Sequence, residues 1–355
     1  MSVNAPAGRI VRATRASRFG GFAAIVIVAA LAAMPWWGER SAMRTVTEFL
    51  YILALAQLWN LMAGFGGLVS IGQQGFLGIG GYVLVLLALK LGVDPFLAVP
   101  LCGVAAALVA CPTAAVVFRL RGAYFAVGTW VVSEVFRLTF ANIIWLGAGT
   151  GTSLTSAMTG HGAWKREAIT LWMAVAMGAG SIALVYLLLR SRMGLALTAI
   201  RDSEVASRSL GVGVPRIKFI VYVLSAFGCG MVGALVYVTK LRISPDAAFD
   251  INWTAVMIFA VVIGGIGTIE GPIIGCLIYF LLRDALADYG AWYLIALGAL
   301  AVIAMVKAPR GIWGLVQARY DLRFFPVQRR IVVAQAVPLP RGGRGRPTAD
   351  SEIRR

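Results

Sequence analysis

The sequence has little charge, few cysteines and a single histidine. Only 13% of its 355 residues are Asp, Glu, Lys or Arg, about half the share usual in soluble domains, and 60% are hydrophobic. This composition excludes an ordinary soluble protein. One histidine cannot form a multi-histidine metal site, and four cysteines without a CxxC pair favour small buried side chains over a metal or redox centre. We expect no metal and no cofactor in this chain.

The short motifs of ATP-hydrolysing and other hydrolytic enzymes are also missing. The sequence contains no GxxxxGK[ST] phosphate-binding loop, no HExxH and no GxSxG. We therefore predict that the chain is not an enzyme and has no ATPase site of its own. Transport against a gradient would need an ion gradient or another subunit as its source of energy.

Long apolar runs fill most of the chain instead. A membrane-spanning helix needs roughly 20 mostly apolar residues, and the mean hydropathy of the chain is +0.84. The sequence predicts an all-α polytopic membrane protein with about ten transmembrane helices. The expected spans are residues 20–37, 45–63, 68–90, 95–118, 122–145, 166–190, 218–239, 253–268, 272–288 and 291–307.

Most of the 32 lysine and arginine residues lie outside these spans, in four stretches. The stretches are the first 19 residues, the turn at 119–121, the loop at 190–218 and the chain from 307 onward. Loops rich in Lys and Arg face the cytoplasm, and ten spans with an internal N-terminus place all four stretches on that side. We therefore expect both termini in the cytoplasm.

The same pattern predicts three regions. A basic segment, 1–19, precedes a transmembrane domain, 20–318, whose longest polar loop is 191–217. The last region, 319–355, is rich in Pro, Gly and Arg, so we expect it to lack regular structure and to lie against anionic lipid. The basic excess follows the topology, and we expect no nucleic-acid binding.

Two glycine-rich stretches occupy comparable places in the two halves of the chain. They are "GFGGLVSIGQQGFLGIGGY", Gly64 to Tyr82, and "GGIGTIEGPIIG", Gly264 to Gly275. Paired stretches of this kind indicate an internal repeat of two helical halves, with broken helices beside a translocation pathway. Small residues also allow helices to pack closely without any pathway. Both interpretations apply to the candidate residues Ser70, Gln73, Gln74, Gly264, Gly265 and Thr268.

Glu134 and Arg137 lie three residues apart within the predicted fifth span. Charged side chains inside a membrane are costly, and this spacing puts the two on one helix face where they can pair. The spacing favours an internal structural pair over a contact with substrate. A channel or ion-coupled transporter would be expected to carry more such residues near mid-membrane.

The loop 191–217 has the pattern of a short amphipathic surface helix. Charged residues, Arg201 and Arg208 among them, alternate with apolar ones, and Gly211 ends the pattern. Such a helix suits the groove of a partner protein. A helix that lies on the membrane surface is the alternative.

Four segments in order resemble the permease subunits of ABC importers for branched-chain amino acids. They are "LWNLMAGFGGLVSIGQQGFLGIGGY", "LRGAYFAVGTWVVSEVFRL", "SRMGLALTAIRDSEVASRSLGVGVPRIK" and "FAVVIGGIGTIEGPIIG". The resemblance covers about residues 45–316. It implies that loop 191–217 docks into a cleft of a separate ATPase, with Glu204, Ala206 and Gly211 on the family's Glu-Ala-Ala…Gly motif. Val205 departs from that motif, and the glycine comes one residue late. The ATPase-coupling candidates are Arg201, Glu204, Ala206, Arg208 and Gly211.

The resemblance also implies a function and a set of partners. The chain would be a permease subunit in a bacterial inner membrane, with a homologous permease, two ABC ATPases that bind the ATP, and a periplasmic substrate-binding protein. Branched-chain amino acids are the expected substrates. Permeases for urea and short-chain amides are similar and stay open as alternatives, as does an ion-coupled secondary transporter or channel.

Overall fold

The computed structural model describes residues 9–11, 15–160, 162–286, 292–308, 311–320, 324–325 and 330–332. Its helices are α1 (Arg15–Ala33), α2 (Arg40–Asn60), α3 (Gln73–Val85), α4 (Pro95–Val117), α5 (Ala123–Ala141), α6 (Ala163–Arg190), α7 (Arg192–Asp202), α8 (Glu204–Ser209), α9 (Val214–Lys240), α10 (Pro245–Ala248), α11 (Asn252–Gly264), α12 (Glu270–Ala285), α13 (Trp292–Lys307) and α14 (Gly311–Tyr320). The π-helical turns η2 (Leu61–Phe65) and η3 (Leu86–Lys90) extend α2 and α3. The 3-10 turns are η1 (Met34–Trp36), η4 (Ile144–Leu146), η5 (Ala148–Thr150) and η6 (Thr155–Met158).

Four short strands accompany the helices. Strands β1 (Arg9–Val11) and β4 (Arg330–Val332) pair antiparallel and join the two ends of the chain. Strands β2 (Thr152–Ser153) and β3 (Arg242–Ile243) form a second antiparallel pair. Strand β4 falls within the region predicted to lack regular structure, most of which lies outside the described residues.

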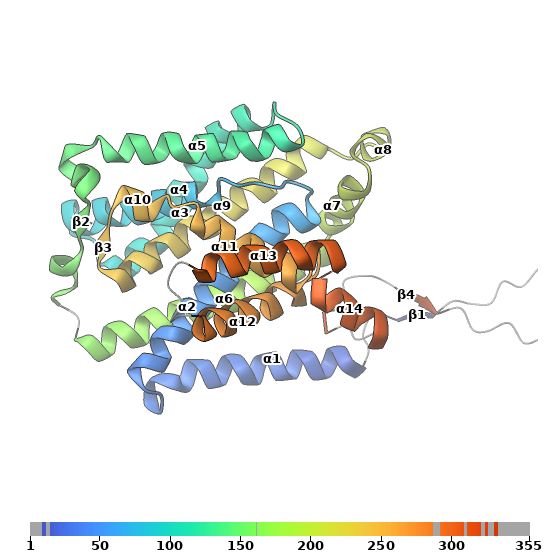
Figure 1. Cartoon of the computed structure of the whole chain (residues 1–355), viewed down its shortest axis with the longest axis horizontal. Helices are drawn as coiled ribbons and strands as arrows, with labels where there is room; N and C mark the ends of the chain where they lie inside the picture. The colour runs from blue at the N-terminus through green and yellow to red at the C-terminus, as the bar shows by residue number, and fades with distance from the viewer. Residues whose placement is uncertain are drawn as a thin grey trace, which may run out of the picture.

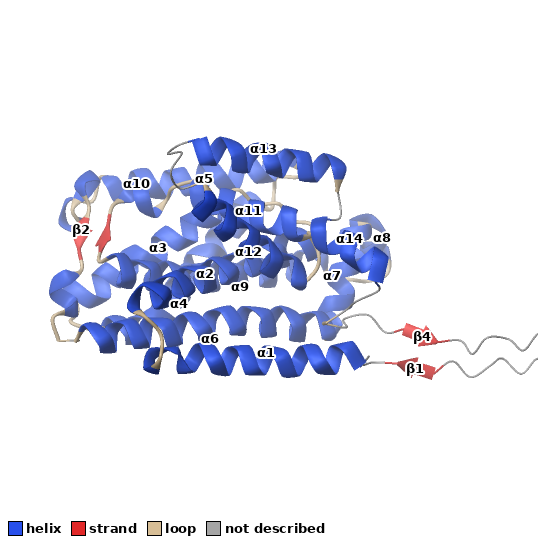
Figure 2. Cartoon of the chain, turned by 60° about the horizontal axis from the view of Figure 1, so that its bottom comes forward, coloured by secondary structure: helices blue, strands red, loops and turns tan. Residues whose placement is uncertain are grey.

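The long helices lie side by side along the long axis of the molecule. In Figure 1, α5 forms one edge of the bundle and α1 the opposite edge, with α2, α3 and α9 between them. Figure 2 shows α6 between α1 and the central helices, and α13 at the edge of the bundle opposite α1. The sequence-based prediction of an all-α membrane protein is therefore confirmed at the level of fold class.

The central helices approach each other closely through glycine. A Cβ atom on Gly80 of α3 would lie 2.0 Å from the carbonyl oxygen of Gly230 on α9. One on Gly233 of α9 would lie 2.0 Å from the carbonyl oxygen of Leu77. Without side chains at these points the two backbones come into contact, as in close-packed membrane helices generally.

Among the described residues, seven helices are long and apolar enough to cross a membrane, or eight if the bent pair at Ala123–Thr150 counts as one span. The predicted number of ten is not confirmed on this criterion. The helix α12 has only 16 residues. The apolar part of the first helix, Gly20–Trp36, is also short, and the chain bends by 90° after α5.

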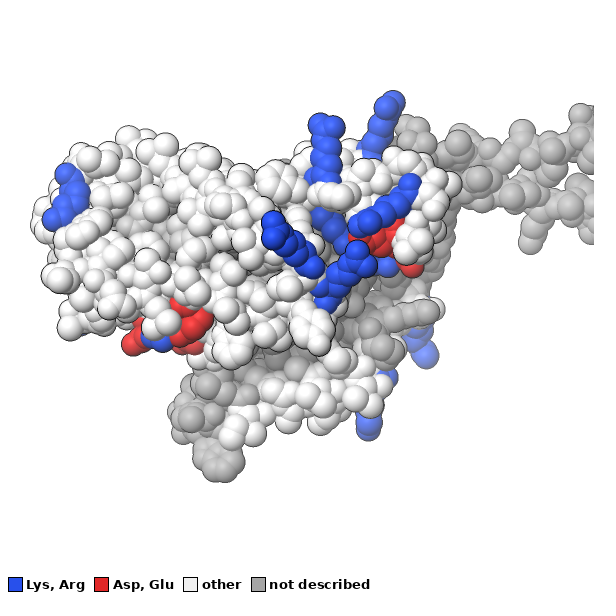
Figure 3. Space-filling view, turned by 90° about the horizontal axis from the view of Figure 1, so that it is seen from above, with Lys and Arg blue, Asp and Glu red and all other residues white. Residues whose placement is uncertain are grey.

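The described parts of the four basic stretches lie at one end of the bundle. Helices α7, α8 and α14 and strand β1 share that end in Figure 1, whereas α10, β2 and β3 occupy the opposite end. Arg121 of the α4–α5 turn lines the same cavity as Arg208 and Lys218. Figure 3, seen from above, shows most of the Lys and Arg of this face toward one end of it.

The α3–α9 contact gives a test of the packing. We expect Gly80→Ala to lower the melting temperature of the purified protein, because the new methyl group overlaps the Gly230 carbonyl and overpacking costs about 1–3 kcal/mol. Gly180→Ala on α6 is the matched control, since a Cβ there meets no atom within 4 Å. Equal melting temperatures for the two variants in detergent would contradict the close crossing.

Candidate functional site

The loop between α6 and α9 forms two short helices, where the sequence pattern predicted one. Ser203 separates them because its backbone is extended, with φ −159° and ψ 111°. Its hydroxyl accepts a hydrogen bond from the Ala206 amide, at 3.2 Å, and so caps the start of α8. This cap turns α8 away from the direction of α7.

The two helices differ in what they bury. Helix α7 buries Gly194, Leu197 and Ile200 against the bundle. Helix α8 leaves Val205 77% exposed, and Leu210 just after it is 81% exposed. Two large apolar side chains on a protruding turn form a surface that another protein can cover.

Glu204 ties α8 to the start of α9. Its carboxylate accepts hydrogen bonds from Lys218 and from Arg208, each at 2.7 Å. The bond from Lys218 holds the pKa of the Glu204 carboxyl below its ordinary 4.5, and Arg208 acts in the same direction. Gly211 follows with φ +80°, a left-handed conformation that lets the chain reverse into α9. Ala206 contributes its backbone amide to the Ser203 cap.

Arg201 connects α7 to the interior of the bundle. Its Nη1 lies 3.5 Å from the carbonyl oxygen of Gly64 in η2. A Cβ atom on Gly267 would lie 3.1 Å from the same nitrogen. One side chain of the loop therefore touches both glycine-rich stretches.

The two glycine-rich stretches lie against each other, and α2 holds them together. Asn60 accepts a hydrogen bond from the Gly267 amide at 2.9 Å and donates to the Thr268 carbonyl at 2.7 Å. Gln57 donates to the Ile269 carbonyl at 2.7 Å. We call Asn60, Gln57 and the chain Gly265–Ile269 the helix junction, because here α11 ends and α12 begins.

The geometry of the helix junction depends on small residues. Gly265 has φ +136°, which a residue with a side chain rarely adopts. A Cβ atom on Gly264 would lie 1.8 Å from the Gly271 carbonyl oxygen. Thr268 donates to the Gly265 carbonyl at 2.7 Å and accepts from the Gly271 amide at 3.0 Å. In this structure, Gly264, Gly265 and Thr268 therefore form the connection between α11 and α12.

The polar residues of the first glycine-rich stretch are buried and bonded to neighbouring helices. Gln74 accepts a hydrogen bond from the Thr254 hydroxyl of α11. Gln73 bonds the sulfur atoms of Met62 and Cys229. Ser70 accepts from the Trp59 indole through its backbone carbonyl, at 2.8 Å. In this structure, Gln73, Gln74 and Ser70 therefore contribute to contacts between helices.

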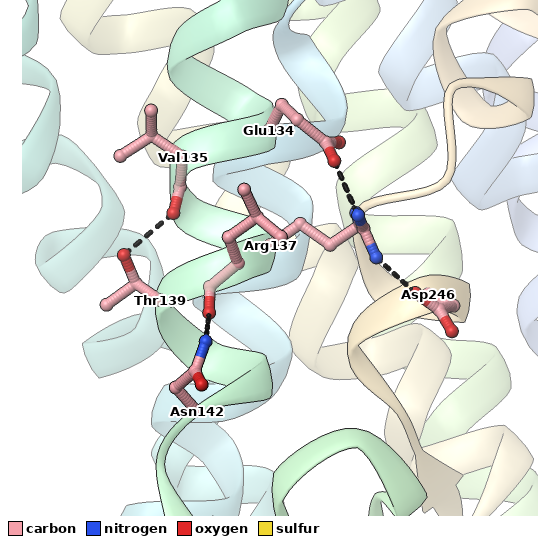
Figure 4. A network of polar contacts seen from close by, with 7 residues as sticks. Glu134, Val135, Arg137, Thr139, Asn142 and Asp246 are labelled. Carbon is pink, nitrogen blue, oxygen red and sulfur yellow. Dashed lines mark hydrogen bonds and ion pairs between the residues drawn. The ribbon is translucent and has the colours of Figure 1, made fainter.

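Glu134 and Arg137 form the pair that their spacing predicted. The Arg137 Nε donates to Glu134 Oε1 at 2.8 Å. Figure 4 shows a third partner on the other side of the guanidinium, Asp246 of α10, which bonds Arg137 Nη1. The pair is not internal to this chain, because the Glu134 side chain is 42% exposed and the Arg137 side chain 29%. An outward-facing strip of α5 carries it.

No signal in the sequence marks Asp246 or the partners of Glu270. Asp246 lies in a four-residue helix between two longer ones, where no periodic pattern marks it. Glu270 is 9% exposed and begins α12, directly after the turn that follows α11. Its carboxylate accepts hydrogen bonds from the amides of Phe324 and Phe325, which lie 54 and 55 residues away in the sequence. No local pattern could have identified that partner.

Comparison with known proteins identifies the relatives of this chain. The family model described as the permease component of the branched-chain amino acid transport system matches residues 41–306. The high-affinity branched-chain amino acid transport system permease protein LivM of Salmonella typhimurium LT2 is 26% identical over 325 residues, which are 84% of this chain and 76% of that protein. LivM of Escherichia coli K12 is 26% identical over 324 residues, with the same coverage.

A shorter match links the chain to a sugar permease. The ribose import permease protein RbsC of Haemophilus influenzae is 28% identical over 129 residues, 35% of this chain and 40% of that protein. No solved structure matches the chain.

The helix junction can be tested directly. We expect Asn60→Ala to destabilise the protein by roughly 1–3 kcal/mol, because it leaves the part-buried Gly267 amide and Thr268 carbonyl without their partner. Asn142→Ala is a matched control, since that exposed side chain bonds only the Leu138 carbonyl of its own helix. Thermal unfolding in detergent measures both variants. A similar small shift for the two would show that Asn60 does not hold the junction.

Proposed function

The chain belongs to the family of branched-chain amino acid transport permease components, and on that basis we propose that it forms the translocation pathway of an ABC importer for branched-chain amino acids. The observation that carries the proposal is the family match over residues 41–306 together with the LivM matches over most of both chains. The ribose permease match spans about a third of this chain and supports only the broader class of import permeases.

Energy is proposed to come from separate ATPase subunits. The end of the bundle that carries α8, which we propose faces the cytoplasm, offers a docking surface with Val205 and Leu210 exposed. A nucleotide-driven movement of a bound ATPase would move α8, and the Glu204–Lys218 bond would pass that movement to the 27-residue helix α9. Arg201 would pass it to the helix junction through Gly64. ATP itself would be bound by the partner subunits.

Further proposals concern the subunits of the transporter and its location in the cell. The chain would pair with a homologous permease, carry two ATPases on the end that holds α7 and α8, and receive substrate from a periplasmic binding protein at the opposite end. Its location would be the bacterial inner membrane. The basic termini would then lie in the cytoplasm near anionic lipid, as the distribution of Lys and Arg indicates. Substrate specificity would come mainly from the binding protein.

The proposed function is tested with the assembled complex. The chain is purified with the subunits that accompany it, reconstituted in vesicles with its binding protein, and supplied with ATP inside. We expect ATP-dependent accumulation of leucine, isoleucine or valine. Accumulation of urea or an amide instead would refute the substrate assignment, and accumulation without nucleotide would refute the ABC mechanism.

The coupling surface gives a sharper test. We expect Val205→Asp and Leu210→Asp to reduce ATP-driven uptake and ATPase copurification at least about tenfold, since a buried charge without a partner costs more than 1.4 kcal/mol. Ser209→Asp, on the same exposed helix, is the matched control and should retain both activities. Full uptake and full ATPase association in the Val205 and Leu210 variants would show that α8 does not carry the coupling contact.

A further inference from the structure

The ionic group on α5 and α10 takes no part in the proposed coupling. It consists of Glu134, Arg137 and Asp246, two carboxylates on either side of one guanidinium (Figure 4). The three side chains are 42%, 29% and 78% exposed. We call it the α5 ionic cluster. It has a formal net charge of one negative unit.

The α5 ionic cluster lies in the half of the membrane farther from α8. Helix α5 begins at Ala123, near the cavity lined by Arg208 and Lys218. At 1.5 Å per residue, Glu134 and Arg137 lie roughly 16–21 Å along the helix, past the middle of a hydrocarbon core about 30 Å thick. Helix α10, which carries Asp246, lies at the opposite end of the bundle from α8 in Figure 1.

An uncompensated charge at this depth does not face lipid. Ionisable residues within spans nearly always face the protein interior or a water-filled cavity. The described residues of this chain leave the α5 ionic cluster partly uncovered, as the exposed fractions show. Water or a polar ligand must therefore reach this face in the assembled transporter, unless another subunit covers it.

The surroundings of the α5 ionic cluster are apolar. Trp130, Val131 and Leu138 are neighbours of Glu134 on the same helix face and are 45%, 52% and 49% exposed. The face thus combines two anionic acceptors, one cationic donor and apolar surface. An amino acid with a branched aliphatic side chain presents the complementary groups, an ammonium, a carboxylate and a hydrocarbon chain.

A stack of three aromatic rings fixes α5 and α10 relative to each other. The Tyr82 ring of α3 lies 4.6 Å from Phe140 and 6.0 Å from Phe249, centroid to centroid. Phe140 follows Arg137 by three residues, and Phe249 follows Asp246 by three residues. The stack therefore holds the two backbones that carry the guanidinium and the second carboxylate at a set separation.

We propose that the α5 ionic cluster is a transient binding subsite for zwitterionic amino acids, located in the outer half of the pathway. This proposal rests on the proposed import function. Glu134 and Asp246 accept hydrogen bonds from the substrate ammonium, and Arg137 donates to its carboxylate. The apolar strip of α5 contacts the aliphatic side chain. Because both carboxylates also bond Arg137, substrate binding replaces existing ion pairs and its net affinity is low.

The first test measures whether a thiol reagent in the external solution reaches a cysteine beside the α5 ionic cluster, and whether substrate protects that cysteine, in the reconstituted complex. A Leu138→Cys variant is made on a Cys111→Ala background, since Cys111 is the exposed cysteine among the described residues. We expect it to react with a membrane-impermeant thiol reagent added outside, and we expect leucine-loaded binding protein with ATP to slow the reaction. Leu108→Cys on α4, 66% exposed, is the matched control for a lipid-facing position and should not react.

The second test separates substrate contact from structure. Removing one charge-assisted hydrogen bond, by Glu134→Gln or Asp246→Asn, should reduce leucine transported per ATP roughly tenfold or more. ATP hydrolysis stimulated by the loaded binding protein should stay near the unmodified level. Asp284→Asn, which removes an exposed carboxylate on α12, should change neither quantity.

Failure of the proposed subsite and failure of the proposed import function give different results in these experiments. No leucine uptake by the unmodified complex overturns the proposed function. If uptake is normal but Leu138→Cys is as unreactive as Leu108→Cys, the proposed subsite is refuted and the proposed function stands. Lipid or another subunit then covers this face of α5. Normal transport per ATP in both charge variants overturns it as well.

Discussion

Backbone hydrogen bonding inside an apolar bundle is the constraint on which the rest of this structure depends. In hydrocarbon, every amide and carbonyl must find a partner within the protein, and for this reason helices rather than loops cross membranes. Between α11 and α12 the chain leaves the helix at Gly265–Ile269. Asn60 and Gln57 of α2 supply the missing partners. Two amide side chains thereby supply partners for the backbone at a helix break that is only partly open to solvent.

The same hydrogen bonds determine which helices move together. Because Asn60 holds Gly267 and Thr268, the break between α11 and α12 is fastened to α2 and its continuation η2. Arg201 reaches the carbonyl of Gly64 in η2 from the surface loop. A displacement of α7 therefore acts on a place where α11 and α12 meet through two glycines with positive φ, Gly265 and Gly267. The α3–α9 contact, where backbones touch, offers no comparable freedom.

The sequence predicted the features that recur along the chain and missed those that depend on single distant partners. The predicted fourth span, 95–118, coincides closely with α4, which begins at Pro95 and is capped by the Asp94 carboxylate. Period and hydropathy located the helices, while the break at Ser203 was missed although a serine before an acidic residue is a helix-start signal. Asn60 lay inside an apolar run with no pattern to distinguish it. Its partner at Gly267 is 207 residues away, a separation that periodicity does not reveal.

If the chain receives its substrate from a binding protein, as we propose, the scarcity of unpaired polar side chains within its described helices has a physical explanation. A site that releases a solute to the next compartment must bind it weakly, since strong binding would trap it. Gln74 and Thr254 bond each other, and Gln73 bonds the sulfur atoms of Met62 and Cys229, so these buried side chains leave few groups for a ligand. Arg137, already held between two carboxylates, can exchange one ion pair for another at little net gain. A guanidinium shared in this way favours passage of the substrate. A dedicated high-affinity pocket would instead retain the substrate.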